Sequence, residues 1–237
     1  MVISFVSFKG GVGKSTLALN LAYQLSLNQK VLLIDTAQQN ALSAYMCKKN
    51  RYGFSDVILN KKPVESVIVK ITEDLSFVSA GLGVYEDVLE YEKNFTGINM
   101  KETLIKIKND YDFIIIDTEA RISKPLFSVI NNSDIYFYVT APTPDCVVAM
   151  KYFKDNIASL QKCRVLVNMM KPDNLSEDFY SYIQALTKNN IFATVPYDTA
   201  VSESIGNCMF VYDFDKDSAF AYNVEKICNK LTKTDGL

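Results

Sequence analysis

The stretch Phe8-Lys9-Gly10-Gly11-Val12-Gly13-Lys14-Ser15-Thr16 decides the fold of this chain. It directly follows the apolar run at residues 2–6 and directly precedes residues 17–22, LALNLA. This order predicts a strand, a glycine loop and the first turn of a helix. The three glycines allow backbone conformations closed to other residues, so successive N–H groups can point at one anion, and the helix dipole adds to the attraction. The stretch therefore predicts a phosphate-binding loop.

The lysine and serine that close the loop indicate a nucleoside triphosphate with its metal ion. Lys14 can reach the β and γ phosphates, and the Ser15 hydroxyl can complete the oxygen shell that Mg²⁺ prefers. A plain glycine-rich turn is the alternative, but the preceding strand and the following helix fall where phosphate binding needs them. The predicted nucleotide-binding residues here are Lys9, Gly10, Gly11, Val12, Gly13, Lys14, Ser15 and Thr16.

Residues 9–15, KGGVGKS, match the deviant Walker A motif K-G-G-x-G-K-[ST] at every fixed position. The chain thus resembles the family of ParA-type partition ATPases, MinD-type positioning ATPases and the nitrogenase iron protein, although the strict Walker A pattern has glycine where Phe8 stands. The resemblance implies that Lys9 crosses to the phosphates of a partner subunit, so that two chains close over two ATP molecules. A cation from the other chain makes pairing depend on nucleotide. The alternative for Lys9 is a solvated loop charge.

Residues 30–35, KVLLID, predict a buried parallel strand whose final carboxylate lies where open α/β sheets bind their ligands. Members of the family usually read D-x-D-P-Q here, and the second Asp positions the attacking water. In this chain Asp35 is the first Asp, Ala37 occupies the place of the second, and Gln38 replaces the proline. A methyl group cannot orient water, so we expect strong ATP binding with hydrolysis slowed by about two to four orders of magnitude relative to an Ala37→Asp variant.

Residues 111–118, YDFIIIDT, contain four apolar residues followed by Asp117, which is the Walker B pattern. Such a strand delivers a carboxylate to the water shell of the metal, although a core strand can also end in Asp by chance. The predicted metal site combines Ser15 with Asp35 and Asp117, the two carboxylates acting through water. The predicted catalytic set is Lys9, Lys14, Asp35 and Asp117, with Ala37 at the position of the expected catalytic Asp. Family members often carry paired prolines next, but this chain has Glu119-Ala120-Arg121, and Arg121 is a candidate contact to nucleotide or partner.

Two later segments are candidates for the adenine site. Residues 164–169 predict a strand with Asn168 near its end, and an amide can donate and accept at once on the edge of the base. Residues 194–198, TVPYD, resemble the strand-to-loop turn of the family, in which the backbone around the proline lies against the base. We therefore expect Asn168 and Pro196 to contact adenine.

Residues 217–233 predict an amphipathic helix with three lysines on one face. Lysines at this spacing commonly form only a solvated surface. In small ParA-like proteins, however, basic residues near this end bind DNA without sequence preference once the dimer forms. Two copies of the stripe could neutralise about half a dozen phosphates, enough for roughly micromolar, salt-sensitive binding. The candidates are Lys226, Lys230 and Lys233, and weaker ones are Arg164, Lys48, Lys49 and Arg51.

Hydrophobic periodicity predicts further helices at residues 54–59, 85–92, 99–109 and 147–160 and further strands at 75–79 and 135–139. The acidic residues of 85–92 are interpreted as a solvated face. Together with the motifs, these segments predict an α/β fold, a doubly wound and mostly parallel sheet flanked by helices, as a single P-loop ATPase domain over residues 1–237.

Composition excludes several classes of site. The 237 residues include no histidine and five cysteines without C-x-x-C spacing, which makes zinc sites and histidine catalysis unsupported. Five scattered cysteines fit small core residues in a reducing cytoplasm. No segment resembles a signal peptide, and the apolar runs are too short to span a membrane. A formal net charge of −2 argues neither for nor against nucleic acid.

The resemblance extends from the first strand to the last helix and implies a ParA-like ATPase for DNA or plasmid partition. ATP would pair two subunits, the homodimer would hold nonspecific DNA, and a ParB-like or adaptor partner would stimulate hydrolysis and release. Because no residues precede Met1, we expect the small subclass, cytoplasmic and nucleoid-associated when bound to ATP.

Three other functions are compatible with the same motifs. A membrane-attached MinD-like protein needs a terminal helix with bulky apolar residues opposite lysines, and residues 232–237 are polar and short, so no membrane partner is expected. A metabolic or metal-handling enzyme needs clustered ligands or a substrate pocket that the sequence does not reveal. A positioning ATPase for another cargo stays open, because fold alone does not identify cargo.

Overall fold

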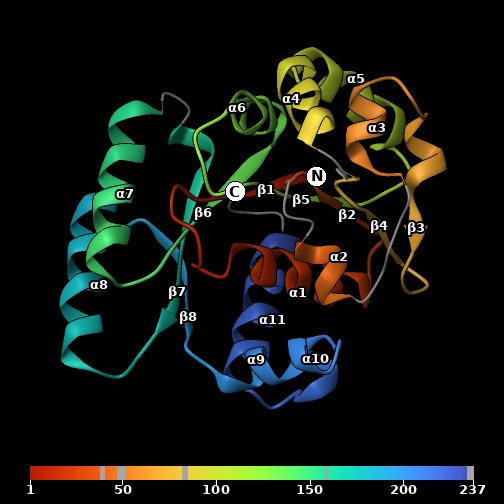
Figure 1. The fold of residues 1–237 in the computed structure, drawn as a ribbon. Coiled ribbons are helices and arrows are strands. Elements are labelled where there is room, and N and C mark those ends of the chain that lie inside the picture. The colour runs from red at the N-terminus through yellow and green to blue at the C-terminus, as the bar shows by residue number, and fades with distance from the viewer. Residues whose placement is uncertain (38–40, 47–51, 82–84, 158–159, 234–237) are drawn as a thin grey trace.

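The computed structural model describes residues 1–37, 41–46, 52–81, 85–157 and 160–233. Its centre is an eight-stranded sheet in the order β3-β4-β2-β5-β1-β6-β7-β8 (Figure 1). Neighbouring strands are parallel, except that β3 runs antiparallel to β4. This confirms the predicted doubly wound, mostly parallel sheet. The strands are β1 (Val2–Val6), β2 (Val31–Asp35), β3 (Val69–Lys70), β4 (Leu75–Val78), β5 (Phe113–Asp117), β6 (Ile135–Thr140), β7 (Cys163–Met170) and β8 (Ile191–Pro196).

Helices cover both faces of the sheet (Figure 1). One face carries α1 (Lys14–Ser26), α2 (Ala41–Tyr45), α9 (Thr199–Gly206), α10 (Val211–Phe214) and α11 (Ala219–Thr232). The other carries α3 (Phe54–Ile58), α4 (Tyr85–Asn94), α5 (Gly97–Ile107), α6 (Lys124–Asn132), α7 (Pro144–Asn156) and α8 (Asn174–Thr187). Two short 3-10 helices are η1 (Val64–Val67) and η2 (Leu160–Lys162).

The central strands are buried on both faces, as their unbroken apolar sequences predict. In β5, Phe113 and Ile115 join the core beneath α1 and α11, whereas Ile114 and Ile116 join the core beneath α5. Successive side chains of a strand point to opposite faces, so each central strand contributes to two hydrophobic cores. This burial holds the carboxyl ends of the strands rigidly in place.

The loop after β1 lies where the chain reverses its direction across the sheet. From β1 the chain passes through α1 to β2 on one side, and from β5 it crosses to β6 on the other side of β1. Open α/β sheets bind ligands at such a switch point, beyond the carboxyl ends of the strands. In the same region, Asp35 of β2 and Asp117 of β5 are register partners on adjacent strands.

Some element boundaries differ from the sequence predictions. The helix predicted at 147–160 is wrong at both ends: α7 begins at Pro144, which follows the extended cap Thr143, and ends before Ile157, whose backbone is extended. Proline suits a first helical turn because an N–H at that position would have no partner within the helix.

The prediction that every cysteine is a small core residue is wrong for Cys208, which is disulfide-bonded. Cys146, Cys163 and Cys228 are free and buried. The elements β3, α2, α6, α8, α9 and α10 were not predicted.

Candidate nucleotide site

Two glycines of the loop between β1 and α1 adopt backbone conformations that other residues rarely take. Gly11 has a φ of 80° and Gly13 a φ of 81°, both in the left-handed region. Gly10 does not adopt a positive φ in this structure. Gly13 also caps α1 without a side chain, and the first turn contains no acidic residue. The first N–H groups of α1 are therefore left for an anion.

The entrance of the loop is fixed by Ser7 and Phe8. The Ser7 hydroxyl donates to the Lys9 carbonyl at 3.0 Å and accepts from the Lys9 N–H at 3.1 Å. The Phe8 ring packs edge-on against Phe153 of α7, with ring centroids 5.2 Å apart. Phe8, which departs from the strict Walker A pattern, thus anchors the loop to the helix beside it.

Asn168 at the end of β7 holds the middle of the loop. Its side chain is 3% exposed, and its Nδ2 donates to the Val12 carbonyl at 2.9 Å. A Cβ atom on Gly13 would lie 2.3 Å from the same Nδ2. The following residue, Met169, has a left-handed φ of 58°, at a register shift between β7 and β8. A bulge changes the direction of a neighbouring side chain, and here the Asn168 amide contacts the loop.

Lys14 is buried against the Walker B strand. Its Nζ lies 2.8 Å from Asp117 Oδ1 and also donates to the Thr118 carbonyl. The side chains are 8% and 0% exposed respectively. The structure therefore brings together two predicted site residues that are 103 positions apart in the sequence.

Asp35 and Asp117 form a buried pair of carboxylates with unused acceptors. Asp35 Oδ1 accepts the Ala37 N–H at 2.8 Å, but Asp35 Oδ2 and Asp117 Oδ2 have no hydrogen-bond partner in the described structure. Burial, and then the charge of Asp117, raise the pKa of the Asp35 carboxyl. A divalent cation beside these oxygens would offset both the burial of the two carboxylates and the repulsion between their charges.

These features fit a hydrated Mg²⁺ held by few protein groups. Ser15 lies in the first turn of α1, lines the cavity over the loop and carries the third oxygen of the predicted set. No three His, Cys, Asp or Glu side chains gather as metal ligands in the part of the chain that the structure describes. Mg²⁺ commonly keeps several waters and takes one or two carboxylates plus substrate phosphates, so the residues present suit it.

Lys9 forms an ion pair with Asp145 in the first turn of α7, whereas Lys14 pairs with Asp117. The Lys9 Nζ lies 2.7 Å from Asp145 Oδ2, and the two side chains are 45% and 54% exposed. The Lys9 hydrogen bond, with a second from the Thr143 hydroxyl, lowers the pKa of the Asp145 carboxyl to about 2. Asp145 was not predicted as a site residue, and its place in the first turn of α7 gave no signal of this contact.

A cavity of about 560 Å³ lies over the loop, within the size range of small-molecule sites. The predicted residues Lys9–Thr16 and Ala37 all line it. Asp35 and Asp117 are fully buried at the ends of β2 and β5. The remaining lining residues were not predicted as nucleotide contacts, apart from Arg121, and are Ala41, Tyr45, Thr118, Glu119, Ala120 and Arg121.

An ion-pair chain runs from this cavity to α4. The Arg121 Nε donates to Glu119 Oε2, and its Nη2 pairs with Glu92 Oε1. Glu92 therefore does more than form the solvated face predicted for this helix. Tyr91, its neighbour on α4, is 1% exposed and its hydroxyl has no hydrogen-bond partner in the described structure. Burial first, and then the charges of Glu119 and Asp35, raise the pKa of Tyr91.

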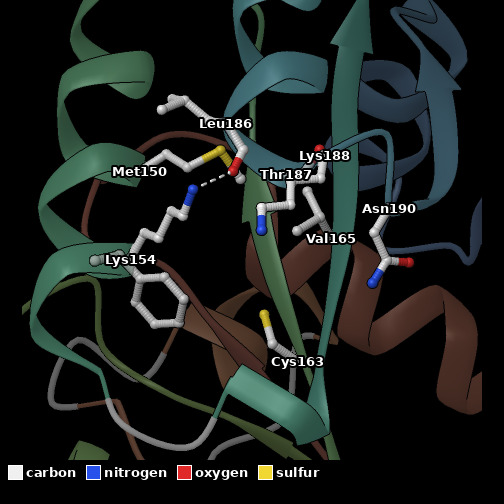
Figure 2. Close-up of a pocket in the computed structure, with 9 residues that line it drawn as sticks. Met150, Lys154, Cys163, Val165, Leu186, Thr187, Lys188 and Asn190 are labelled. Atoms are coloured by element: carbon white, nitrogen blue, oxygen red, sulfur yellow. Dashed lines mark hydrogen bonds between the residues drawn. The ribbon is translucent and has the colours of Figure 1, made fainter.

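A second cavity, of about 270 Å³, lies between α7, α8 and β7, and its lining is mostly apolar (Figure 2). Lys154 Nζ donates across it to the Leu186 carbonyl at 2.8 Å. Burial raises the pKa of the Cys163 thiol there to about 12, so the thiol stays protonated at neutral pH. None of the predicted site residues lines this cavity.

The predicted base and DNA contacts lie outside the phosphate cavity. Pro196 ends β8, and neither it nor Asn168 is among the cavity lining, so their adenine role stays a prediction.

The lysines predicted to bind DNA have contacts within the chain. Lys230 Nζ donates to the Phe192 carbonyl at 2.8 Å, and Lys226 Nζ lies 4.2 Å from the Tyr222 ring centroid. Lys233 is exposed. Arg164 donates to the Gln161 and Cys163 carbonyls, and Lys48, Lys49 and Arg51 lie outside the described residues.

Comparison with known proteins supports the fold. A family model described as AAA domain matches residues 1–164. A virulence plasmid ParA family protein of Chlamydia trachomatis is 25% identical over 246 residues, 96% of this chain and 92% of that protein. The septum site-determining protein MinD of Helicobacter pylori is 27% identical over 242 residues, 94% of this chain and 87% of that protein. The solved structure of MinD from Pyrococcus horikoshii OT3, complexed with Mg-ADP, has a TM-score of 0.83 at 22% identity and covers 99% of this chain and 97% of that one.

Proposed function

This chain belongs to the AAA domain family of ParA-type and MinD-type ATPases, and from this premise we propose that it is a ParA-like partition ATPase. Two subunits pair face to face over two ATP molecules, each with Mg²⁺. The homodimer holds nonspecific DNA, and a ParB-like or adaptor protein stimulates hydrolysis and so releases it. This cycle takes place in the cytoplasm, on the nucleoid when ATP is bound.

One observation carries the proposal: the cavity over the phosphate-binding loop is lined by two lysines in different environments. Lys14 lies inside, against Asp117, where it can bind the β and γ phosphates of its own site. Lys9 lies at the surface, 45% exposed, where a neighbouring chain can approach it. A triphosphate closed between subunits needs such extra cationic groups.

Within the subunit the residues divide the work. The N–H groups of the loop and the start of α1 bind the phosphates, and Lys14 fixes the γ end. Ser15, Asp35 and Asp117 would hold Mg²⁺, which when bound neutralises developing charge on the phosphates. Thr36 donates from its N–H and hydroxyl to the Asp117 carbonyl at 3.0 Å and 2.8 Å, which joins the loop after β2 to that after β5.

Ala37 lines the cavity where the family has the water-positioning Asp. We expect slow hydrolysis for this reason, and an Ala37→Asp variant should turn over ATP about two to four orders of magnitude faster. The measurement is phosphate release by the purified protein under saturating ATP and Mg²⁺. An unchanged rate would mean that position 37 does not limit the reaction.

The test of the proposed function is the molecular mass and the DNA affinity of the purified protein with ATP, with ADP and without nucleotide. Pairing and DNA binding should both require ATP, and replacing Lys226, Lys230 and Lys233 by Gln should weaken DNA binding and its salt dependence. If the molecular mass and the DNA affinity were the same with and without nucleotide, the proposed role in DNA partition would be rejected.

A MinD-like positioning function has one specific observation in its favour, the identity to MinD. The described chain has no helix long and apolar enough to cross a membrane, but an interfacial helix does not need to cross. ATP-dependent binding to anionic vesicles, without DNA binding, would favour this function over partition.

A further inference from the structure

We propose that Glu119 orients the attacking water in this chain, less effectively than Asp would at position 37, so that it supports the slow turnover expected above. The inference rests on the proposed function, since it concerns hydrolysis of ATP in the cavity described above. Asp35 and Asp117 are register partners on β2 and β5, so Ala37 and Glu119 each stand two residues beyond one member of that pair. Both residues line the cavity. The carboxylate missing from one loop is thus present on the adjacent one.

Glu119 lies at the γ-phosphate end of the cavity. Lys14 Nζ donates to the carbonyl of Thr118, the residue immediately before Glu119, and to Asp117. A lysine at this position of a phosphate loop reaches the β and γ phosphates. The residue that follows Thr118 is therefore placed beside the phosphate that is cleaved.

The Glu119 carboxylate is held in a defined orientation. Its side chain is 16% exposed, and the Arg121 Nε donates to its Oε2 while the same guanidinium pairs with Glu92 of α4. A carboxylate has about four acceptor positions, enough to accept from a water molecule besides its protein partners. Arg121 is accordingly a positioning residue.

The reaction step is an in-line displacement. The water oxygen forms a bond to the γ phosphorus while the bond from that phosphorus to the β–γ bridging oxygen breaks, and its electron pair leaves with ADP. Glu119 accepts a hydrogen bond from the water, takes one of its protons as the new bond forms, and returns that proton to solvent. The products are ADP and inorganic phosphate, and no other reactant is needed.

The decisive variant is Glu119→Gln, and Glu92→Gln is its matched control. Both remove a carboxylate from the same Arg121, but only Glu119 lines the cavity. We expect Glu119→Gln to lower turnover by about 10²-fold or more, while ATP affinity and ATP-dependent mass stay unchanged and the ATP-bound dimer lasts longer after excess ADP is added. Glu92→Gln should lower turnover much less, because it loosens Arg121 but leaves the carboxylate that lines the cavity in place. Equal losses in both variants would assign a structural role to Glu119 and overturn the inference.

Rescue provides the second arm. In an Ala37→Asp background, Glu119→Gln should cost far less turnover, because Asp at position 37 can orient the water. A full loss in that background would overturn the inference. If the unmodified chain bound ATP and paired, yet Glu119→Gln hydrolysed ATP normally, only this inference would fail. If the unmodified chain bound no ATP, the proposed function would fail first.

Discussion

Lys9 and Lys14 belong to one loop, and their environments differ sharply. Lys14 is 8% exposed and pairs with a fully buried carboxylate at the end of a central strand. Lys9 is 45% exposed and pairs with Asp145, itself 54% exposed. Charge and motif position alone do not set the role of a lysine. The burial of its carboxylate partner decides how strongly each amine is held inside its own subunit. Lys14 is paired inside its own chain, whereas we propose that the exposed Lys9 leaves Asp145 to reach the phosphates of a partner subunit.

The largest effect should come from Lys14→Ala. This change leaves Asp117 buried without its cation, and breaking a buried pair costs about 3–5 kcal/mol in the free energy of unfolding. We also expect ATP binding to be lost, since the phosphates lose their internal cation. Urea unfolding and equilibrium ATP binding measure the two effects. A variant as stable as the parent would show that burying the Asp117 carboxylate without Lys14 does not destabilise the fold.

Lys9→Ala serves as the matched comparison on the same loop. The exposed pair with Asp145 should contribute no more than about 1 kcal/mol, so stability and ATP binding by the monomer should be nearly retained. ATP-dependent dimers should disappear, as light scattering would reveal. Dimers that persist would refute the cross-subunit role of Lys9.

A smaller effect is expected from Asp145→Asn, which releases Lys9 from its contact within the chain. If Lys9 must leave Asp145 to reach a partner's phosphates, the ATP concentration for half-maximal pairing should fall by up to about fivefold, the equivalent of an exposed pair. Asp155→Asn, at the other end of α7, is the control. An unchanged or weaker dimer would show that the pair does not compete with association.

The smallest effect concerns pH. The folded pKa of Asp145, about 2, lies below the unfolded value of about 3.9, so the stabilisation from the Lys9 pair is fully present above that unfolded value and is lost as pH falls through about 2. Carboxyl NMR titration of the parent and of Lys9→Ala would measure it. In Lys9→Ala the pKa of Asp145 should rise toward its ordinary value, and no rise would identify the Thr143 hydroxyl as the main cause.

The sequence predicted the elements whose signals are local. Residues 2–22 specify strand, loop and helix through glycine spacing, the Lys-Ser pair and the apolar periodicity. The strands that end in Asp35 and Asp117 were equally clear, because four apolar residues followed by one carboxylate suit a buried parallel strand. The family resemblance, which the comparisons confirm, implied the doubly wound sheet, but the order of its strands was not predicted.

Contacts between distant segments could not be predicted. Lys14 meets Asp117 only because β5 lies next to β1 in the sheet, and Lys9 meets Asp145 only because α7 begins beside the loop. Glu119 was noticed as a departure from the family's prolines, but its position in the cavity depends on the register between β2 and β5. Such information lies in packing, not in periodicity.

The grip of Asn168 on the Val12 carbonyl has a consequence for the energetics of ligand entry. Val12 cannot swing outward without breaking that bond, and Gly13 rests against the same amide. The sheet therefore already orders the phosphate-binding loop before any ligand is present, so the loop loses little backbone entropy when a phosphate binds.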